Sequence, residues 1–163
     1  MALQTQPLRD EHKELLPQVE HLLAAADSIG GDGPSPERVK AAYEFLAHHL
    51  LVHAQAEEAA LYPVVAKVMG APEVTKTMER DHKEIQRLTA ELAAFQNPDA
   101  MTHATNQQLN DLRRVLYGLY TLVKVHFAKE EEVYLPILDQ RLTATEASAM
   151  FESLERAAEK ARH

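Results

Sequence analysis

The chain contains no cysteine and only small amounts of glycine and proline. Without cysteine, disulfide scaffolds, thiolate zinc sites, iron–sulfur clusters and cysteine nucleophiles are excluded, so any strong metal ligands are nitrogen and oxygen atoms. Five glycines and eight prolines in 163 residues are too few for most all-β folds, which need a turn roughly every 8–12 residues. The apolar fraction of 45% is enough for one domain with a buried core.

Charge and hydropathy argue against nucleic-acid and membrane partners. Acidic residues outnumber basic ones by 25 to 17, and the formal net charge of −8 disfavours binding to a phosphate backbone. No uninterrupted apolar run is long enough to span a membrane. The first ten residues lack the cationic segment and apolar run of a secretory leader. We therefore expect a soluble, cytoplasmic protein.

Turn and capping residues divide the chain into predicted helices. Proline directly after serine is typical of a helix start, and threonine followed three residues later by glutamate forms a capping box. The breaks lie at Gly30 to Pro34 before Ser35-Pro36, at Gly70 and Pro72, at Asn97-Pro98, and before Thr143 and Glu146. We predict one domain, residues 1–163, with bundle helices at about 8–29, 36–68, 72–95 and 105–140 and an additional helix at about 144–160.

Along the predicted helix 105–140, apolar residues recur at alternating spacings of three and four, which is the pattern of a helix-bundle core. They are Leu109, Leu112, Leu116, Leu119, Val123, Val133 and Ile137. Two positions of this pattern are filled by His126 and Glu130 instead. One imidazole and one carboxylate are therefore expected to interrupt the core face of this helix.

The other bundle helices show a similar interruption. In the helix 36–68, His53 and Glu57 fall on a face that is otherwise apolar, at Tyr43, Leu46, Leu50, Leu61 and Val64. The helices 8–29 and 72–95 place His12 and His82 on their apolar faces. Each bundle helix is thus predicted to point a histidine into the core, and two of them add a glutamate one turn later.

The interrupting residues belong to an internal repeat. His12-Lys13-Glu14-Leu15 is echoed by His82-Lys83-Glu84-Ile85, and His53-x3-Glu57-Glu58-x4-Pro63 by His126-x3-Glu130-Glu131-x4-Pro136. The offsets of 70 and 73 residues indicate one duplicated helical hairpin. Two such hairpins predict an all-α, antiparallel up-and-down four-helix bundle. The additional helix would pack outside it or form a contact between two copies in a homodimer.

Buried carboxylates need a compensating partner, because taking an ion out of water costs several kcal/mol. No lysine or arginine shares the core positions named above, so the candidate partners are protonated histidines or metal cations. Residues four apart on a helix can chelate one ion, and bundle cores hold two-metal carboxylate sites. Imidazole and carboxylate ligands suit iron, with manganese and zinc as alternatives. We interpret His12, His53, His82 and His126 as terminal ligands of two metal ions, and Glu57 and Glu130 as bridging ligands.

Other polar residues have weaker predicted roles. For any one histidine alone, hydrogen bonding in an ordinary bundle is the favoured explanation, but six residues in register across two halves favour a metal site. Glu58, Glu131 and Glu132 adjoin the proposed ligands and are expected to be solvated or to support those ligands. His49 lies one turn before His53 and is a candidate additional ligand or proton relay. The tyrosines are expected to pack in the bundle.

The constellation resembles the hemerythrin-like family, whose members are also called HHE cation-binding domains, over roughly residues 8–140. The residues that carry the resemblance are Asp10-Glu11-His12-Lys13-Glu14-Leu15, His53-x3-Glu57-Glu58 with Leu61-Tyr62-Pro63, Asp81-His82-Lys83-Glu84, and His126-x3-Glu130-Glu131-Glu132 with Tyr134-Leu135-Pro136. Each part alone is weak, but all four in this order are highly specific. The resemblance implies a non-heme di-iron site with an oxo or hydroxo bridge inside a four-helix bundle.

Two positions differ from the oxygen-carrying members of that family. Those members have a second histidine four residues after the one in the third helix, where this chain has Gln86, and they bridge from the last helix with aspartate, where it has Glu130. One protein ligand is then missing, and water, His49, Glu58, a tyrosine or an exogenous ligand would fill its place. An open coordination position is typical of catalytic metal sites, which disfavours simple reversible oxygen carriage.

Three classes of function follow from this pattern. The favoured one is a di-iron oxidoreductase-like protein that acts on hydrogen peroxide, nitric oxide or dioxygen, by catalase-like or nitric-oxide-handling chemistry. The alternative is a protein that binds, senses or stores dioxygen, nitric oxide or iron without turnover. A purely structural bundle is disfavoured by the repeated motif. No catalytic residue is identified from the sequence, although Glu58 or a metal-bound hydroxide could act as a base.

Overall fold

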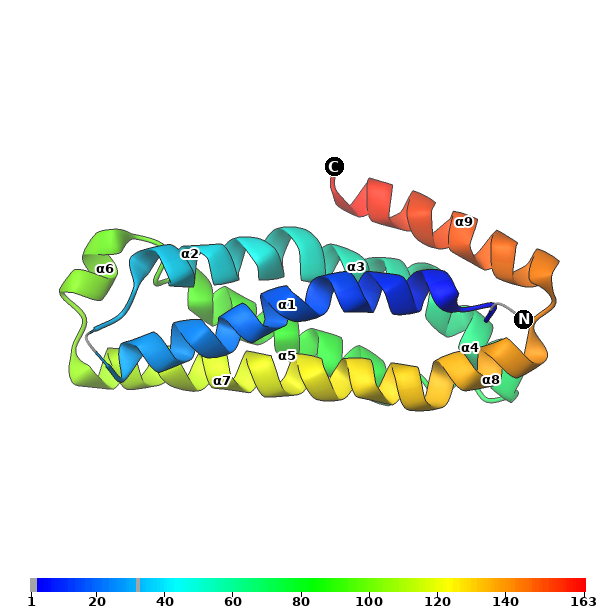
Figure 1. Cartoon of the computed structure of the whole chain (residues 1–163), viewed down its shortest axis with the longest axis horizontal. Coiled ribbons are helices and arrows are strands. Elements are labelled where there is room, and N and C mark those ends of the chain that lie inside the picture. Colours follow the sequence, from blue (N-terminus) through cyan, green and yellow to red (C-terminus); the bar gives the residue numbers. More distant parts are fainter. Residues whose placement is uncertain (1–2, 32) are drawn as a thin grey trace.

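The computed structural model describes residues 3–31 and 33–163, and within these residues the regular structure is helical, without strands (Figure 1). The all-α fold predicted from the sequence is confirmed. The helices are α1 (Gln6–Ile29); α2 (Pro36–Phe45), η1 (Leu46–Leu50), α3 (Leu51–Ala56), η2 (Glu57–Leu61) and α4 (Tyr62–Met69); α5 (Lys76–Ala93); α6 (Pro98–Thr102); α7 (Asn106–Lys129), η3 (Glu130–Tyr134) and α8 (Leu135–Arg141); and α9 (Ala144–Ala161).

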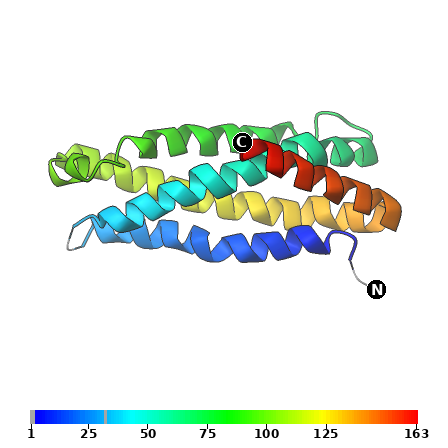
Figure 2. The ribbon, with the colours of Figure 1, turned by 90° about the horizontal axis from the view of Figure 1, so that it is seen from above.

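Four long helical segments run side by side in alternating directions. The segments are α1, the continuous run from α2 to α4, α5, and the continuous run from α7 to α8 (Figures 1 and 2). α1 packs against α2 and α7, and α5 packs against α7, α2 and α3, so that each segment contacts two neighbours around the bundle. α9 lies outside and crosses over α3 and η2. None of the described helices is both long and apolar enough to cross a membrane.

The bundle core consists of two apolar clusters with a polar layer between them. Along α1, Val19 belongs to the cluster at one end of the bundle and Leu8 to the cluster at the other end. His12 lies between these two residues in the chain and is also buried. The close packing of the apolar residues on both sides holds the helices together. This packing fixes the positions of the side chains in the polar layer.

Helix bounds follow the sequence signals with two differences. Gly70 ends α4 with a φ of +68°, the left-handed conformation that glycine adopts without strain. Thr143 and Glu146 form the predicted capping box at the start of α9. The third bundle helix begins at Lys76 rather than near residue 72, because residues 72–75 form a turn. The short helix α6 was not among the predicted helices.

Each of the two segments that carry a His-x3-Glu motif contains a π-helical turn that begins at the glutamate itself. In η2, the amide of Tyr62 donates to the carbonyl of Glu57, and in η3 the amide of Leu135 donates to that of Glu130. A proline follows directly in both cases, at the start of α4 and α8, and its missing N–H prevents the regular α-helical bond at that point. Single π turns of this kind are frequent at functional sites.

The π turn at η3 shifts the core face by one residue, which corrects the sequence prediction. Val133, predicted to face the core, is 46% exposed, and Ile137 is only partly buried. Tyr134 and Leu138, one position later, are buried instead. The same shift replaces the predicted Val64 by Val65. One extra residue in a turn rotates the following positions by about 100°, which the regular spacing of the sequence does not reveal.

This shift is testable by a pair of alanine substitutions. Leu138→Ala should lower the free energy of unfolding by about 2–5 kcal/mol, because it leaves a cavity in the core. Val133→Ala should change it by less than about 0.5 kcal/mol, because that side chain lies at the surface. Urea denaturation followed by circular dichroism measures both values. A larger loss for Val133→Ala than for Leu138→Ala would contradict the shifted face.

Candidate metal centre

All six residues predicted as metal ligands lie together in the polar layer of the bundle. Each side chain is buried, with an exposed fraction of 5% or less. The histidines come from four different segments, and the glutamates are the first residues of the π turns η2 and η3. The residues are His12 on α1, His53 on α3, Glu57 on η2, His82 on α5, His126 on α7 and Glu130 on η3.

The two glutamates lie between two pairs of histidines. Glu57 places Oε1 2.9 Å from Nε2 of His53 and Oε2 3.3 Å from Nε2 of His82. Glu130 places Oε2 3.3 Å from Nε2 of His12 and Oε1 3.4 Å from Nε2 of His126. Each carboxylate therefore turns one oxygen to each half of the site, which is the arrangement expected of a ligand that bridges two cations.

The ligand atoms form two groups that share Glu57. The first group contains His12, His53, Glu57 and Glu130, the second contains Glu57, His82 and His126, and within each group the candidate ligand atoms lie within 4.8 Å of one another. In the second group, Nε2 of His82 and Nε2 of His126 face each other at 2.9 Å. Oε1 of Glu130 also lies on the side of the second group, where it accepts a hydrogen bond from the hydroxyl group of Tyr62.

Several buried polar atoms at the centre of the site are without a hydrogen-bond partner in the described part of the chain. They are Nε2 of His12, Nε2 of His53, both side-chain oxygens of Glu57 and Oε2 of Glu130. Buried polar atoms are normally paired, so such a cluster indicates groups that bind something other than protein. Burial would raise the pKa of Glu57, but the charge of His53 holds it well below its usual range, as a negatively charged metal ligand requires. The residues present therefore fit a site for metal cations.

Comparison with known families agrees with this geometry. The model of the hemerythrin HHE cation binding domain matches residues 4–138, a range that includes all six residues. The chain belongs to the hemerythrin HHE cation-binding domain family. Searches of the curated proteins and of the solved structures each found no significant match. α9 begins after the matched range, so this HHE domain carries a helix that the family match does not include.

A second layer of carboxylates surrounds the histidines of the HHE domain. On each imidazole, Nε2 faces the centre and Nδ1 lies 2.8–3.0 Å from a carboxylate oxygen. Carboxylates in this position fix the orientation of a metal-binding histidine and make it a stronger ligand. The pairs are His12 with Glu131, His53 with Glu11, His82 with Glu58, and His126 with Asp81.

These four pairs form a closed ring around the bundle. In each pair the carboxylate is the sequence neighbour of a proposed ligand, but it contacts the histidine of an adjacent helical segment. The pairs join α1 to α3, η2 to α5, α5 to α7, and η3 back to α1. Every proposed histidine ligand is thus held from a neighbouring segment, which couples its orientation to the packing of the whole bundle.

Without cations, protonated histidines balance the buried carboxylates. Burial by itself would lower the pKa of His12, but contacts with Glu130 and Glu57 outweigh it and raise the pKa to about 9. Burial would also lower the pKa of His126, but the hydrogen bond to Asp81 and the contact with Glu130 outweigh it and raise the pKa to about 11. Cations that enter the site therefore replace protons.

Tyr62 makes the two halves of the centre unequal. Its hydroxyl group donates to Oε1 of Glu130 at 2.9 Å and lies 3.2 Å from Nε2 of His82 and 3.4 Å from Nε2 of His126. Burial, followed by the charges of Glu57 and Glu130, raises its pKa above the usual value, so the hydroxyl keeps its proton. At the corresponding position of the other repeat stands Leu135, which offers no hydrogen-bonding group.

The structure changes several sequence interpretations. His49 is exposed, so it is not an additional ligand, and Gln86 is exposed too and does not reach the centre. Of the three glutamates expected to be solvated or supporting, Glu58 and Glu131 contact histidines, whereas Glu132 is exposed. Two supporting carboxylates were not predicted, although both directly precede a proposed histidine ligand in the sequence: Glu11 and Asp81. Tyr62, interpreted as packing, lies at the centre.

The supporting role of the outer carboxylates can be tested on adjacent residues of η3. Glu131→Ala should weaken the binding of cobalt(II) about 10–100-fold, because His12 loses the partner that orients it. Glu132→Ala is the matched control and should leave the affinity unchanged, because that side chain is exposed. Competition with a chelator of known affinity measures both. Equal affinities for the two variants would contradict the role given to Glu131.

Proposed function

We propose that this HHE domain is a non-heme di-iron protein that reacts with a small molecule such as hydrogen peroxide, nitric oxide or dioxygen. The observation that carries the proposal is the placement of Glu57 and Glu130, each with one oxygen toward either pair of histidines. A donor set of imidazole and carboxylate suits iron. Two bound iron ions would supply Lewis acidity and one-electron redox chemistry.

The unequal halves support a reaction at the side of His82 and His126. In that half, the protonated hydroxyl of Tyr62 lies beside both histidines and donates a hydrogen bond to Oε1 of Glu130. This hydroxyl is placed to donate a hydrogen bond to a small molecule and to hold or return a proton, with Glu130 as its present acceptor. The depth of the site, where no histidine is more than 5% exposed, favours a molecule of only a few atoms.

Hydrogen peroxide can react without an additional reductant or oxidant, because one peroxide molecule can oxidise another. In the reaction 2 H2O2 → O2 + 2 H2O, one peroxide molecule loses two electrons and two protons. The second molecule gains them, and its O–O bond breaks. The protein contributes a buried site that admits few competing reductants and, in Tyr62, a group that moves a proton. We therefore propose catalase-like turnover of peroxide as the activity to be measured first.

Iron content tests the metal assignment. Protein isolated from iron-replete cells should hold about two iron ions per chain, because the core offers two groups of ligands that share Glu57. Glu57→Ala removes the shared residue and should reduce the content to one iron or fewer, whereas Glu14→Ala, a change at an exposed position of α1, should retain both. Elemental analysis gives the numbers. Zinc in place of iron in the unaltered protein would refute the redox proposal.

Oxygen release from peroxide tests turnover and the role of Tyr62. Iron-loaded protein should release many molecules of dioxygen per site in an oxygen-electrode assay. Tyr62→Phe should retain its iron but lower the rate about 100-fold or more, as expected for loss of a proton-transfer group. The control is Tyr134→Phe, because the hydroxyl of Tyr134 donates to the backbone carbonyl of Val74 and does not contact the centre. Binding of a single equivalent without turnover would contradict the proposal and indicate a binding or sensing protein.

A further inference from the structure

α9 covers the helical segment that carries His53 and Glu57. It packs on α3 and η2, the elements that carry these two residues. In the first half of α9, Ala147 and Met150 are buried, whereas Phe151 and the apolar residues after it are partly exposed. In Figure 1 the helix diverges from the bundle toward the C-terminus. It is joined to α8 by a short extended segment at Leu142 and Thr143.

A groove of about 340 Å3 lies between the second half of α9 and the bundle. Its floor includes Ala56, the residue directly before Glu57, and His53, whose Nδ1 faces Glu11 at the same place. Phe151 and Leu154 of α9 form the apolar roof. The groove thus ends at the imidazole of His53, at the outer edge of the metal centre.

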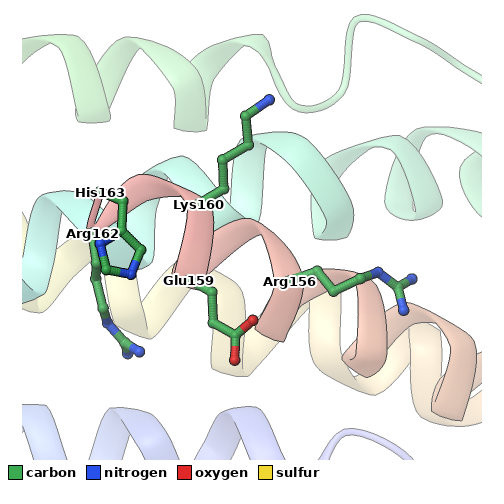
Figure 3. A pocket seen from close by; sticks show the side chains of 5 residues that line it. All are labelled: Arg156, Glu159, Lys160, Arg162 and His163. Atoms are coloured by element: carbon green, nitrogen blue, oxygen red, sulfur yellow. The ribbon is translucent and has the colours of Figure 1, made fainter.

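Other hollows are poorer entrances. A hollow between α1 and α7 reaches His12, but there the ring of Phe127 stacks on the imidazole at a centroid distance of 4.3 Å, and Leu16 adds further bulk. A hollow at the C-terminal end of α9 is lined only by residues of α9 and the two residues after it. Figure 3 shows that its side chains, such as Arg156 and Lys160, point in different directions rather than toward a common centre.

The two hollows that reach the centre differ in charge. The groove under α9 carries Glu11, Glu155 and Glu159 against one cation, Arg162, so its rim is negative. In Figure 3, Glu159 and Arg162 extend to the same side of α9. The hollow at His12 has the opposite balance, with three basic residues and one acidic one: Arg9, Lys13, Lys124 and Glu131. A negative rim disfavours anions and does not hinder neutral molecules.

We propose that the groove under α9 is the entrance through which a small uncharged molecule reaches the metal centre, with Leu154 and Phe151 setting its width. The inference rests on the proposed function, because it names the route and the charge class of the molecule that reacts there. The small side chain of Ala56 lines this groove next to His53, whereas the ring of Phe127 stacks on His12 in the other hollow. α9 forms the cover of this groove.

Xenon locates the entrance without any metal. Crystals of the metal-free protein under xenon pressure should bind the gas in the groove among Ala56, Phe151 and Leu154, because xenon occupies apolar cavities that a small neutral molecule can reach. Xenon bound only beside Leu16 and Phe127, or no bound xenon, would overturn the proposal. Loss of iron binding would refute the proposed function but would not alter this result, so the two failures are distinguishable.

A pair of tryptophan variants tests width and charge together. The chain has no tryptophan, so Leu154→Trp and Leu16→Trp each place a single fluorophore in one of the two hollows. For each metal-free variant, the quenching of tryptophan fluorescence by iodide is divided by the quenching by neutral acrylamide. This ratio should be lower for Leu154→Trp than for Leu16→Trp, because the rim of the groove under α9 is negative and that of the hollow at His12 is positive. Equal or reversed ratios would contradict the selection against anions.

The same pair tests the route in the iron(II)-loaded protein. Leu154→Trp should slow the association of nitric oxide in stopped-flow measurements about tenfold, whereas Leu16→Trp should leave it unchanged. Leu154→Ala removes bulk from the roof and should accelerate association, which keeps the test available if the tryptophan variant does not fold. Slower association in Leu16→Trp alone would assign the entrance to the hollow at His12 and overturn the proposal.

Discussion

The burial of two carboxylates, Glu57 and Glu130, is the constraint on which the rest of the structure depends. Neither side chain has any exposed surface, and each charge costs several kcal/mol to remove from water. His12, His53 and His126, whose pKa values are raised, carry compensating charge as imidazolium groups in the absence of cations. The outer nitrogens of all four histidines are held in turn by carboxylates that lie nearer to solvent. Apolar clusters on both sides of this layer supply the packing that keeps these unfavourably buried groups in place.

The π turns at Glu57 and Glu130 show where sequence reasoning about the fold succeeds and where it fails. The three–four spacing before Glu130 gives the correct core face, because those residues lie in the regular α-helix α7. Beyond it, the face moves by one residue, and Val133 is exposed although the spacing continues. The signal was present as Pro63 and Pro136, which lack the N–H that a regular helix needs at that point. A proline indicates that the hydrogen bonding changes, but not whether the helix kinks, ends or takes up an extra residue.

For the candidate site, contacts within one helix could be predicted from the sequence, whereas contacts between helices could not. His53 with Glu57, and His126 with Glu130, could be found because residues four apart must share a face, and the repeat shows that both hairpins use this arrangement. The pairing of Glu11 with His53 depends on how α1 meets α3, which spacing within one helix cannot give. Tyr62 could be predicted only in part. The repeat shows that Tyr62 stands where the second hairpin has Leu135, but the contact of its hydroxyl with the centre depends on how the helices pack.

Duplication therefore explains the ligands of the centre, and departures from duplication explain its chemistry. A strictly symmetric pair of hairpins would give two equivalent metal positions and no reason for a molecule to react at one of them. Here the hydroxyl of Tyr62 lies beside His82 and His126, while α9, which has no counterpart after the first hairpin, covers the side of His53. The proposed entrance and the hydroxyl of Tyr62 are thus on opposite halves, and Glu57 contacts one histidine of each half. A molecule admitted beside His53 would therefore enter on the half away from Tyr62, and the negative rim of the groove favours a neutral molecule over an anion at that entrance.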